Sequence, residues 1–221
     1  CCKTEGSFLC PECLAAIKLK EAVGCPACKA RSQFGEYCKG CGQEELAGLL
    51  AIADYENYFL QEAIKAYKYA RLPELAQSFA SLYAESRPLS SLLQNYRGAL
   101  LVPIPLHRRR KNWRGFNQAE LLAREISKLA PASRVADEVL IRRRYTASQV
   151  EVKSADKRRE NIKGAFAVKE GSAVFGQRVI LVDDVATTMS TLSEAARELK
   201  KAGAKEVFGV VLARGQHLTN N

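Results

Sequence analysis

Over residues 47–221 the pattern of apolar and polar positions switches repeatedly between two periods. Short continuous apolar runs, typical of strands buried on both faces, alternate with longer stretches whose apolar residues recur every three or four positions, as in helices. This alternation predicts an α/β fold in which a mostly parallel sheet is flanked by helices. Residues 87–97 are polar and rich in turn formers, and they predict a connection. The expected strands are 49–55, 99–105, 139–142, 164–168, 179–182 and 205–213, and the expected helices are 58–69, 72–84, 116–129 and 191–201.

The first 41 residues differ in composition, because all eight cysteines of the chain lie among them. Three CxxC pairs begin at positions 10, 25 and 38. In a reducing compartment such pairs present thiolates to a tetrahedral Zn²⁺. Disulfides are the alternative, but they imply secretion, for which nothing else in the sequence argues. We therefore expect residues 1–46 to form a double zinc-ribbon module that needs structural zinc to fold, followed by the α/β domain at 47–221.

Spacing leaves the pairing of these cysteines open. The pairs at 25/28 and 38/41 are close enough to form one four-cysteine site. The pair at 10/13 then needs two further thiolates, for which Cys2 with a partner just upstream, or with Cys1, is the better candidate. A crossed arrangement, in which alternate pairs share a metal, is the alternative. The expected zinc ligands are Cys2, Cys10, Cys13, Cys25, Cys28, Cys38 and Cys41.

The net charge of +10 and the pI near 9.3 indicate that the long-range field of the protein attracts anions. Phosphorylated small molecules and nucleic acid both have the required charge. The longest apolar stretch, residues 47–53, is too short to span a bilayer, and the first residues do not form a charged and then apolar signal segment. We therefore expect a cytoplasmic protein without membrane insertion.

Residues 179–191 combine three features of a phosphate site. Four apolar residues predict a buried strand that ends in two carboxylates, and a hydroxyl-rich loop and a helix follow. Backbone N–H groups at a helix N-terminus, together with nearby hydroxyls, hold phosphate, and open α/β sheets bind ligands at this carboxyl edge. The alternative is a strand end whose two carboxylates face solvent and cap the next helix.

This stretch resembles the phosphoribosyl pyrophosphate (PRPP) motif of type I phosphoribosyltransferases. The resemblance implies that the two carboxylates accept hydrogen bonds from the ribose 2′ and 3′ hydroxyls, that the loop wraps the 5′-phosphate, and that Mg²⁺ arrives with PRPP. The motif usually has Gly at position 189, so either the loop keeps its path with the Met189 side chain pointing away, or phosphate affinity is reduced. The implied PRPP-binding residues are Asp183, Asp184, Val185, Ala186, Thr187, Thr188, Met189, Ser190 and Thr191.

A strongly basic segment follows the apolar run 99–105. Five of the seven residues at 108–114 are Lys or Arg, and we expect a loop that meets an anion, with a merely solvated surface as the alternative. The sequences Pro-Ile-Pro-Leu-His at 103–107 and Arg-Gly-Phe-Asn-Gln-Ala-Glu-Leu-Leu-Ala at 114–123 resemble the ComF family of competence-associated, phosphoribosyltransferase-like proteins, which also carry a zinc ribbon. By that resemblance Leu106, His107 and Arg108 are candidate pyrophosphate contacts.

Residues 143–164 form a long basic excursion between two expected strands. It resembles the flap that closes over PRPP in amidophosphoribosyltransferase-like proteins, where a Gln, an Arg and an Asn recur at positions matched here by Gln149, Arg158 and Asn161. Residues 155–161 of the excursion are expected to be helical, and a structureless basic loop is the alternative. The candidate catalytic residues are Arg144, Arg158 and Asn161.

Two functions agree with these features. The first is phosphoribosyl transfer from PRPP, in which Thr187 stands where purine-salvage enzymes have an acidic base-contacting residue, so that a 6-oxopurine acceptor is disfavoured. The second is a catalytically inactive scaffold that binds single-stranded DNA or a competence helicase through basic loops beside Trp113, Phe116 and Tyr145. The resemblance to ComF proteins implies a role in DNA uptake in either case.

Overall fold

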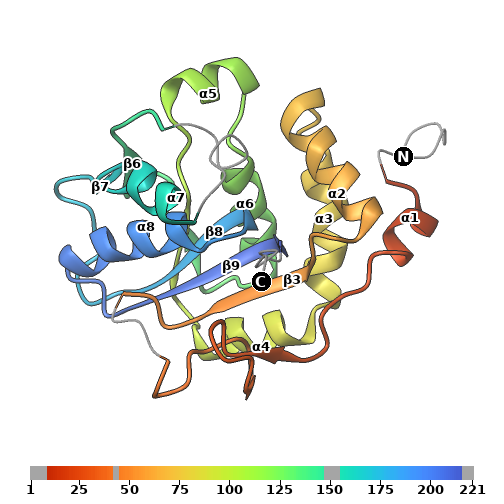
Figure 1. The fold of residues 1–221 in the computed structure, drawn as a ribbon, viewed down its shortest axis with the longest axis horizontal. Coiled ribbons are helices and arrows are strands. Elements are labelled where there is room, and N and C mark those ends of the chain that lie inside the picture. Colours follow the sequence, from red (N-terminus) through yellow and green to blue (C-terminus); the bar gives the residue numbers. More distant parts are fainter. Residues whose placement is uncertain (1–8, 42–44, 147–154, 216–221) are drawn as a thin grey trace.

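The computed structural model describes residues 9–41, 45–146 and 155–215 (Figure 1). These residues form a central sheet of five parallel strands in the order β3-β9-β8-β4-β5. The prediction of a mostly parallel sheet is therefore confirmed. The strands are β3 (Leu49–Asp54), β4 (Leu100–Pro103), β5 (Arg134–Val135), β8 (Arg178–Ala186) and β9 (Glu206–Arg214).

Apolar side chains alternate between the two faces of the sheet, as the pleat of a strand requires. Leu50 and Ile52 belong to one buried cluster, while Leu49 and Ala51 belong to the other. Both faces are thus covered, and the flanking helices expected from sequence are present. The first face carries α2 (Tyr58–Lys65), η1 (Ala66–Ala70), α3 (Leu75–Glu85), α4 (Arg87–Asn95) and α6 (Gln118–Leu129). The second carries α8 (Ser190–Lys201), α7 (Ala155–Ile162) and the antiparallel hairpin of β6 (Leu140–Arg142) and β7 (Phe166–Val168).

The expectation of a connection at 87–97 is wrong, because α4 occupies most of it. The Ser86 hydroxyl accepts a hydrogen bond from the Leu89 N–H at 3.3 Å, which caps the helix, and Pro88 lies in its first turn, where proline is tolerated. Leu89 and Leu92 are fully buried. A narrow apolar stripe on an otherwise polar segment is therefore enough to bury this helix against the sheet.

The expected end of the central strand at residue 182 is also wrong. β8 continues to Ala186, because β9 pairs with it along its whole length and places Asp183 opposite Val211. The two carboxylates, expected at the end of the strand, therefore lie within it, and the strand ends at Ala186. β5, the edge strand, is too short to leave an apolar pattern in the sequence, and it was not predicted.

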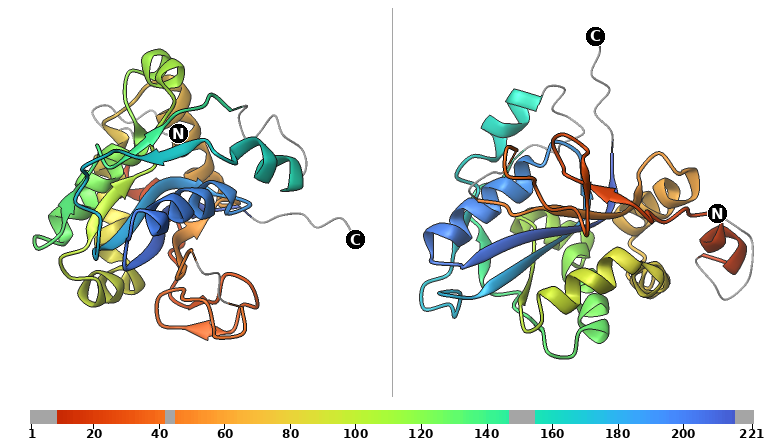
Figure 2. Two further views of the ribbon diagram at one scale, coloured as in Figure 1. Left: turned by 90° about the vertical axis from the view of Figure 1, so that its left-hand side faces the viewer. Right: turned by 90° about the horizontal axis from the view of Figure 1, so that it is seen from below.

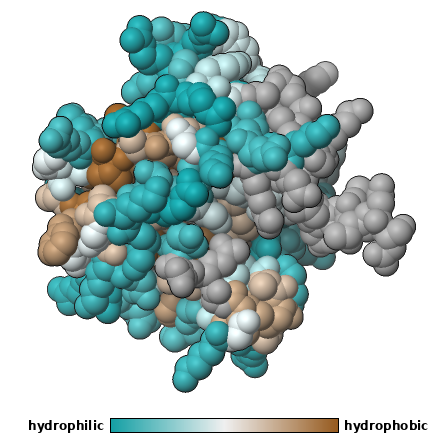
Figure 3. Space-filling view, turned by 60° about the vertical axis from the view of Figure 1, so that its left-hand side comes forward, coloured by the Kyte–Doolittle hydropathy of each residue, from teal (hydrophilic) through white to brown (hydrophobic). Residues whose placement is uncertain are grey.

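The basic segment after β4 forms a helix, α5 (Arg108–Arg114), and not the expected loop. His107 caps it, since the His107 Nδ1 atom accepts a hydrogen bond from the Arg109 N–H at 3.3 Å. Gly115 ends it with a φ of 88°, a left-handed conformation that suits glycine. The consequence is that the basic side chains leave the backbone in fixed directions. Hydrophilic residues accordingly cover the top of the molecule, where α5 lies (Figure 3).

The N-terminal region contains α1 (Pro11–Ala15) and a two-stranded antiparallel sheet of β1 (Val23–Gly24) and β2 (Arg31–Ser32). Its cysteine-bearing loop protrudes from the α/β body in the left view of Figure 2. Two backbone hydrogen bonds attach the region to β3: the Lys20 N–H donates to Ile52 O, and the Leu49 N–H donates to Gly35 O, both at 2.9 Å. The domain boundary at residue 46 stays a prediction.

Phe34 links the N-terminal region to the core of the α/β domain. It is 6% exposed, and its ring packs edge to face against Phe208 of β9 and against Tyr96, with centroids 5.6 and 6.3 Å apart. We expect Phe34→Ala to lower the free energy of unfolding by about 3 kcal/mol, because it leaves a cavity. Guanidinium denaturation followed by circular dichroism measures this. Phe175→Ala, at a site that is 85% exposed, is the control. An unchanged midpoint for Phe34→Ala would show that the region folds independently of the sheet.

Candidate functional site

A cleft of about 510 Å³ lies at the carboxyl edge of the sheet. Residues from the end of β8, from the segment after β4, from η1 and from α5 and α6 line it. In Figure 1, α5 lies to the left of α2, and both lie above the strands. The cleft therefore lies where open α/β sheets bind ligands.

Asp184 is the most deeply buried carboxylate of the cleft, with 6% of its surface exposed. Lys68 of η1 lies against it, with Nζ 2.7 Å from Asp184 Oδ1. Burial lowers the pKa of Lys68, but the charge of Asp184 and the hydrogen bond to it outweigh burial and raise that pKa. Lys68 is therefore a charged partner that sequence reasoning missed, since a lysine in a helix 116 positions away leaves no sequence signal of the contact.

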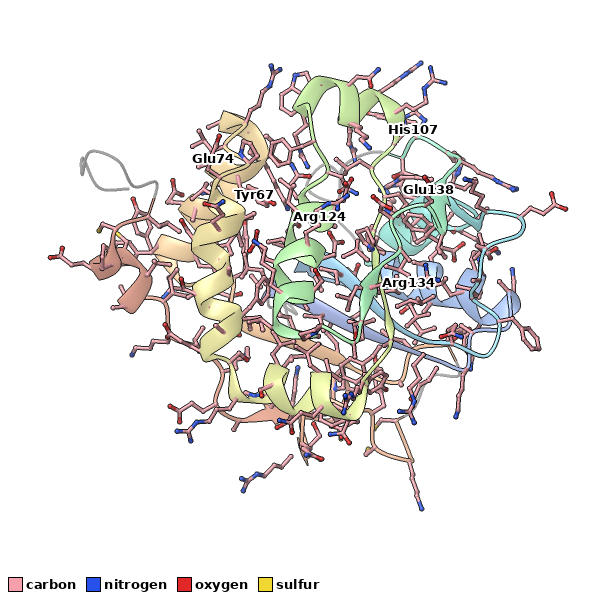
Figure 4. All side chains as sticks on the ribbon, turned by 180° about the vertical axis from the view of Figure 1, so that it is seen from behind. Tyr67, Glu74, His107, Arg124, Arg134 and Glu138 are labelled. Carbon is pink, nitrogen blue, oxygen red and sulfur yellow. The ribbon has the colours of Figure 1, made fainter. Side chains whose placement is uncertain are left out.

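The π-helical geometry of η1 presents Lys68 to the cleft. Tyr67, labelled in Figure 4, is fully buried, and its hydroxyl donates to the carbonyl of Gln118 at the start of α6, at 3.1 Å. Its ring also packs against Phe79 of α3 with centroids 5.5 Å apart. Single turns of π-helix frequently mark functional sites. Here the turn is fixed by the buried tyrosine next to the lysine.

The carboxyl of Asp183 has a raised pKa. Its burial and the neighbouring charge of Asp184 raise the pKa of Asp183 to about 7, although Lys68 and the Asp184 N–H act in the opposite direction. That N–H donates to Asp183 Oδ1 at 2.9 Å. The carboxyl of Asp183 therefore changes charge near neutral pH, a property typical of binding and catalytic sites.

The loop after β8 passes through a left-handed residue. Met189 lies immediately before α8 with φ 64° and ψ −9°, the left-handed conformation that glycine usually takes. Its side chain packs against the buried cluster that contains Leu192. The backbone at position 189 thus takes a conformation that glycine favours, at a cost of roughly 1–2 kcal/mol for a non-glycine residue, and the effect on phosphate affinity stays a prediction. Thr187 and Thr191 line the cleft, and the hydroxyls of Thr188 and Ser190 are 2.8 Å apart.

Of the three candidate pyrophosphate residues, the structure brings Leu106 to the cleft, while His107 and Arg108 do not line it. His107, labelled in Figure 4, caps α5, and its ring meets the edge of Tyr145 at 5.2 Å. Partial burial, followed by the charges of Arg109 and Arg142, lowers the pKa of His107 and favours the neutral imidazole.

Other basic residues line the cleft in their place: Arg109, Arg110 and Arg114 of α5, and Arg142 of β6. The sequence could have indicated part of this set, because a helix at 108–114 brings positions 110, 113 and 114 to one face. Burial, followed by repulsion from Arg110, lowers the pKa of Arg142 to about 10. Arg110 and Arg142 both donate to Thr146, to its carbonyl and its hydroxyl respectively.

The residues expected in the flap over PRPP differ in their positions relative to the cleft. Asn161 of α7 lines the cleft. Arg144 does not line it, and instead donates to the backbone carbonyls of Asn161 and Lys163 at 2.8 and 2.7 Å, joining the two arms of the excursion. Gln149 and the side chain of Arg158 lie outside the described residues. Residues 155–161 are helical as expected.

Glu194 of α8 anchors the end of this excursion. It is 7% exposed, accepts a hydrogen bond from the Gly164 N–H at 2.6 Å and pairs with Arg197 at 2.6 Å. The excursion is therefore attached to the helix that begins at the candidate phosphate loop.

The four cysteines at 25, 28, 38 and 41 could hold one metal ion, because their sulfur atoms all lie within 4.8 Å of one another. Burial raises the pKa of Cys25, but backbone N–H groups of Cys28, Cys38 and Ala27 outweigh it and lower that pKa to about 6, which favours the thiolate that zinc binds. Cys10 and Cys13 are buried in the apolar cluster of the sheet, and Cys1 and Cys2 lie outside the described residues. The second zinc site stays a prediction.

The metal site is attached to the carboxyl edge of the sheet. Arg214, the last residue of β9, donates from Nη2 to the carbonyl of Pro26 at 3.0 Å. Arg214 also pairs in register with Ala186. Arg214 therefore links the cysteine loop, through its side chain, to the start of the candidate phosphate loop, through the pairing of the two strands. Within the described part of the chain, no helix is both long and apolar enough to cross a membrane.

The family described as Phosphoribosyl transferase domain matches residues 114–221. The chain is 28% identical to Competence protein F of Haemophilus influenzae, covering 94% of this chain and 97% of that protein. It is 32% identical to DNA utilization protein YhgH of Escherichia coli K12, covering 90% and 87%, and 30% identical to Competence protein ComFC of Bacillus subtilis, covering 89% and 81%.

Replacing one thiolate tests the four-cysteine metal site. We expect Cys38→Ser to lower the zinc content of the purified protein by about one equivalent per chain, because a structural site needs all four ligands. The melting temperature should fall with it, since a structural zinc contributes folding free energy. Zinc released by a thiol reagent is measured with a colorimetric chelator. Lys39→Ser, at the exposed neighbouring position, is the matched control. Equal zinc in wild type and Cys38→Ser would contradict the assignment.

Proposed function

Because the chain belongs to the ComF family of competence-associated, phosphoribosyltransferase-like proteins, we propose that its cleft binds PRPP with Mg²⁺ and that the protein acts in DNA uptake. The observation that carries the proposal is the course of the chain from Asp183 to α8. Two carboxylates at the end of the central strand are followed by a left-handed residue and a helix N-terminus that faces the same cleft.

Each group of PRPP finds a chemical complement along this course. Asp183 and Asp184 offer acceptor oxygens to the vicinal ribose hydroxyls. The loop 185–191 offers backbone N–H groups and hydroxyls to the 5′-phosphate. Arg109 and Arg110, which line the cleft, offer positive charge to the pyrophosphate, and Leu106, just before α5, lines the same cleft. Mg²⁺, when bound with PRPP, would neutralise further charge on the pyrophosphate.

Transfer of the phosphoribosyl group would depend on positioning and on charge stabilisation. As pyrophosphate leaves C1, the ribose becomes cationic and the leaving group gains negative charge. The Asp pair would stabilise the first charge, and Arg109 and Arg110 the second. Asn161, at the base of the excursion 143–164, would help to exclude water from the cleft. Zinc at the four-cysteine site would have a structural role, because the four thiolates complete a tetrahedral coordination sphere.

Contact with single-stranded DNA is supported by a different set of residues. Tyr145 is 47% exposed, and the guanidinium groups of Arg109 and Arg110 lie 5.6 and 5.3 Å from the centre of its ring. An exposed ring among cations suits base stacking with phosphate contact. The relatives named for competence and DNA utilization agree with such a role. Because Tyr145, Arg109 and Arg110 all line the cleft, DNA and PRPP would share the two arginines.

The ribose contact is tested with Asp184→Asn. We expect calorimetric titration to show Mg²⁺-dependent binding of PRPP to the wild type, and a loss of at least about tenfold in affinity in the variant, since a charged hydrogen-bond acceptor is removed. Asp137→Asn, on the surface beside Arg124, is the matched control. Absence of PRPP binding to the wild type would exclude the proposed pocket.

The same proteins distinguish the two ligands. Affinity for a single-stranded oligonucleotide, measured by fluorescence anisotropy, should fall steeply with salt and should be the same in Asp184→Asn as in the wild type. Loss of both ligands in the variant would instead indicate a damaged fold.

The pKa of Asp183 predicts how PRPP binding depends on pH. Only the ionised carboxyl accepts hydrogen bonds from both hydroxyls, and with a pKa of about 7 this form becomes dominant as the pH rises. The affinity should therefore increase roughly tenfold between about pH 6 and pH 8. In Asp183→Asn the increase should be smaller, because only the phosphates of the ligand still titrate. Titrations at several pH values measure both proteins, and parallel profiles would contradict the assignment.

A further inference from the structure

One corner of the cleft takes no part in the proposed binding of PRPP. It is formed by Tyr69 of η1, Trp113 and Arg114 of α5 and Gln118 of α6, and we call these four residues the aromatic corner. The rings of Tyr69 and Trp113 are 55% and 50% exposed. Their centroids are 6.3 Å apart and their planes are inclined by 59°. The two rings thus form an open wedge instead of a closed stack.

Arg114 is the unusual member of this corner. It is 9% exposed, and among the described residues no carboxylate lies within 4.0 Å of its guanidinium. Its Nη1 donates to Gln118 Oε1 at 2.6 Å, and its guanidinium lies 5.8 Å from the centre of the Tyr69 ring. Burial lowers the pKa of Arg114 despite the attraction of Asp184. A buried cation without an anionic partner is costly, and an anionic ligand would offset that cost.

Gln118 provides a second buried donor that needs a hydrogen-bond acceptor. It is 2% exposed, and its Nε2 has no hydrogen-bond partner within the described residues, as is also true of the Arg114 Nε atom. Two residues that line one cleft thus each hold a buried donor without a partner among the described residues. Guanidinium and amide groups in this arrangement suit the two oxygens of a planar carboxylate.

The charges of the cleft restrict the ligand further. Among the described lining residues, six cations stand against the two carboxylates of Asp183 and Asp184, and Lys68 already neutralises Asp184. A cationic ring would therefore be repelled. A flat conjugated ring can stack on Tyr69 or Trp113, which a sugar or a phosphate cannot do as well.

We propose that the aromatic corner binds a planar conjugated carboxylate, with its ring against Tyr69 and Trp113 and its carboxylate on Arg114 and Gln118. As the second ligand of the cleft, beside PRPP, this molecule rests on the proposed function and would be the phosphoribosyl acceptor. The lone pair of a ring nitrogen would form a bond to C1 of the ribose while the C1–O bond breaks, and pyrophosphate would leave with the electron pair of that bond. Its binding as such needs no PRPP, so the two proposals can be tested separately.

Trp113 is the only tryptophan of the chain, so intrinsic fluorescence reports directly on the corner. The probes are pyridine-3-carboxylate and its uncharged amide, which have the same ring. We expect saturable quenching by the carboxylate, and at least about tenfold weaker binding of the amide, because a charged hydrogen bond to Arg114 is lost.

Variants identify the contacts. Arg114→Gln should weaken carboxylate binding at least about tenfold and remove the preference over the amide. Tyr69→Ala changes an exposed side chain and should weaken both probes without disturbing the fold. Arg97→Gln, an exposed arginine outside this cleft, is the control and should leave quenching unchanged.

Several outcomes would overturn the proposal. Equal binding of carboxylate and amide would exclude a role for Arg114, and so would unchanged quenching in Arg114→Gln. Competition by inorganic pyrophosphate at equal strength would assign the corner to the pyrophosphate. Quenching by a single-stranded oligonucleotide alone would make it part of a nucleic-acid surface. If the carboxylate binds while PRPP does not, the corner stands and the proposed function fails; if only PRPP binds, the corner proposal alone fails.

Discussion

The candidate site depends on the pairing of β8 with β9. This pairing runs from Arg178 to Ala186 and carries the strand past the point where its apolar residues end. It holds Asp183 and Asp184 on a rigid strand, where their carboxyl groups have fixed directions. It also continues one step further, since the Gly215 N–H donates to the Ala186 carbonyl at 3.0 Å. The left-handed turn at Met189 therefore begins from a position set by the sheet, which lets a non-glycine residue be held there.

A second constraint is the burial of charge around this edge. Lys68 and Asp184 satisfy each other, whereas Arg114 and Arg142 have partners that are mostly neutral. Burying such groups in a hydrophobic core costs free energy. Here they line an open cleft, where an anionic ligand can pair with them. The distribution of satisfied and unsatisfied charges thus separates the cleft into parts. The Asp pair and the α8 terminus form one part, Arg109 and Arg110 a second, and the aromatic corner a third.

The sequence predicted those features that are local. The strands at 49–55, 99–105 and 205–213 were recognisable because both faces of the sheet are covered, and the motif at 179–191 because strand, loop and helix follow one another directly. α4 was missed because its apolar stripe is narrow and its other side chains are polar. β5 was missed because two residues carry no period.

Contacts between distant residues could not be predicted. Nothing near Lys68 indicates Asp184, because the pair depends on how η1 packs on α6 through Tyr67. The basic run at 108–114 was interpreted as a loop on the strength of its charge, whereas a helical interpretation would have placed Arg110, Trp113 and Arg114 on one face. Composition thus indicated an anion-binding segment, and only the backbone conformation identified which residues face the cleft.

The strand order has a consequence for synthesis of the chain. β3 leaves the ribosome before β4, β8 and β9, yet its neighbour in the sheet is β9, which is made after all of them. The cysteine loop is in the same position, since the Pro26 carbonyl receives its hydrogen bond from Arg214 at the end of β9. In the nascent chain, β3 therefore lacks its neighbour in the sheet until β9 emerges. Only then can β9 insert between β3 and β8. Until then the exposed edge of β3 favours association with other chains, so metal bound early at the cysteine loop would be the first feature to order the early half of a nascent chain.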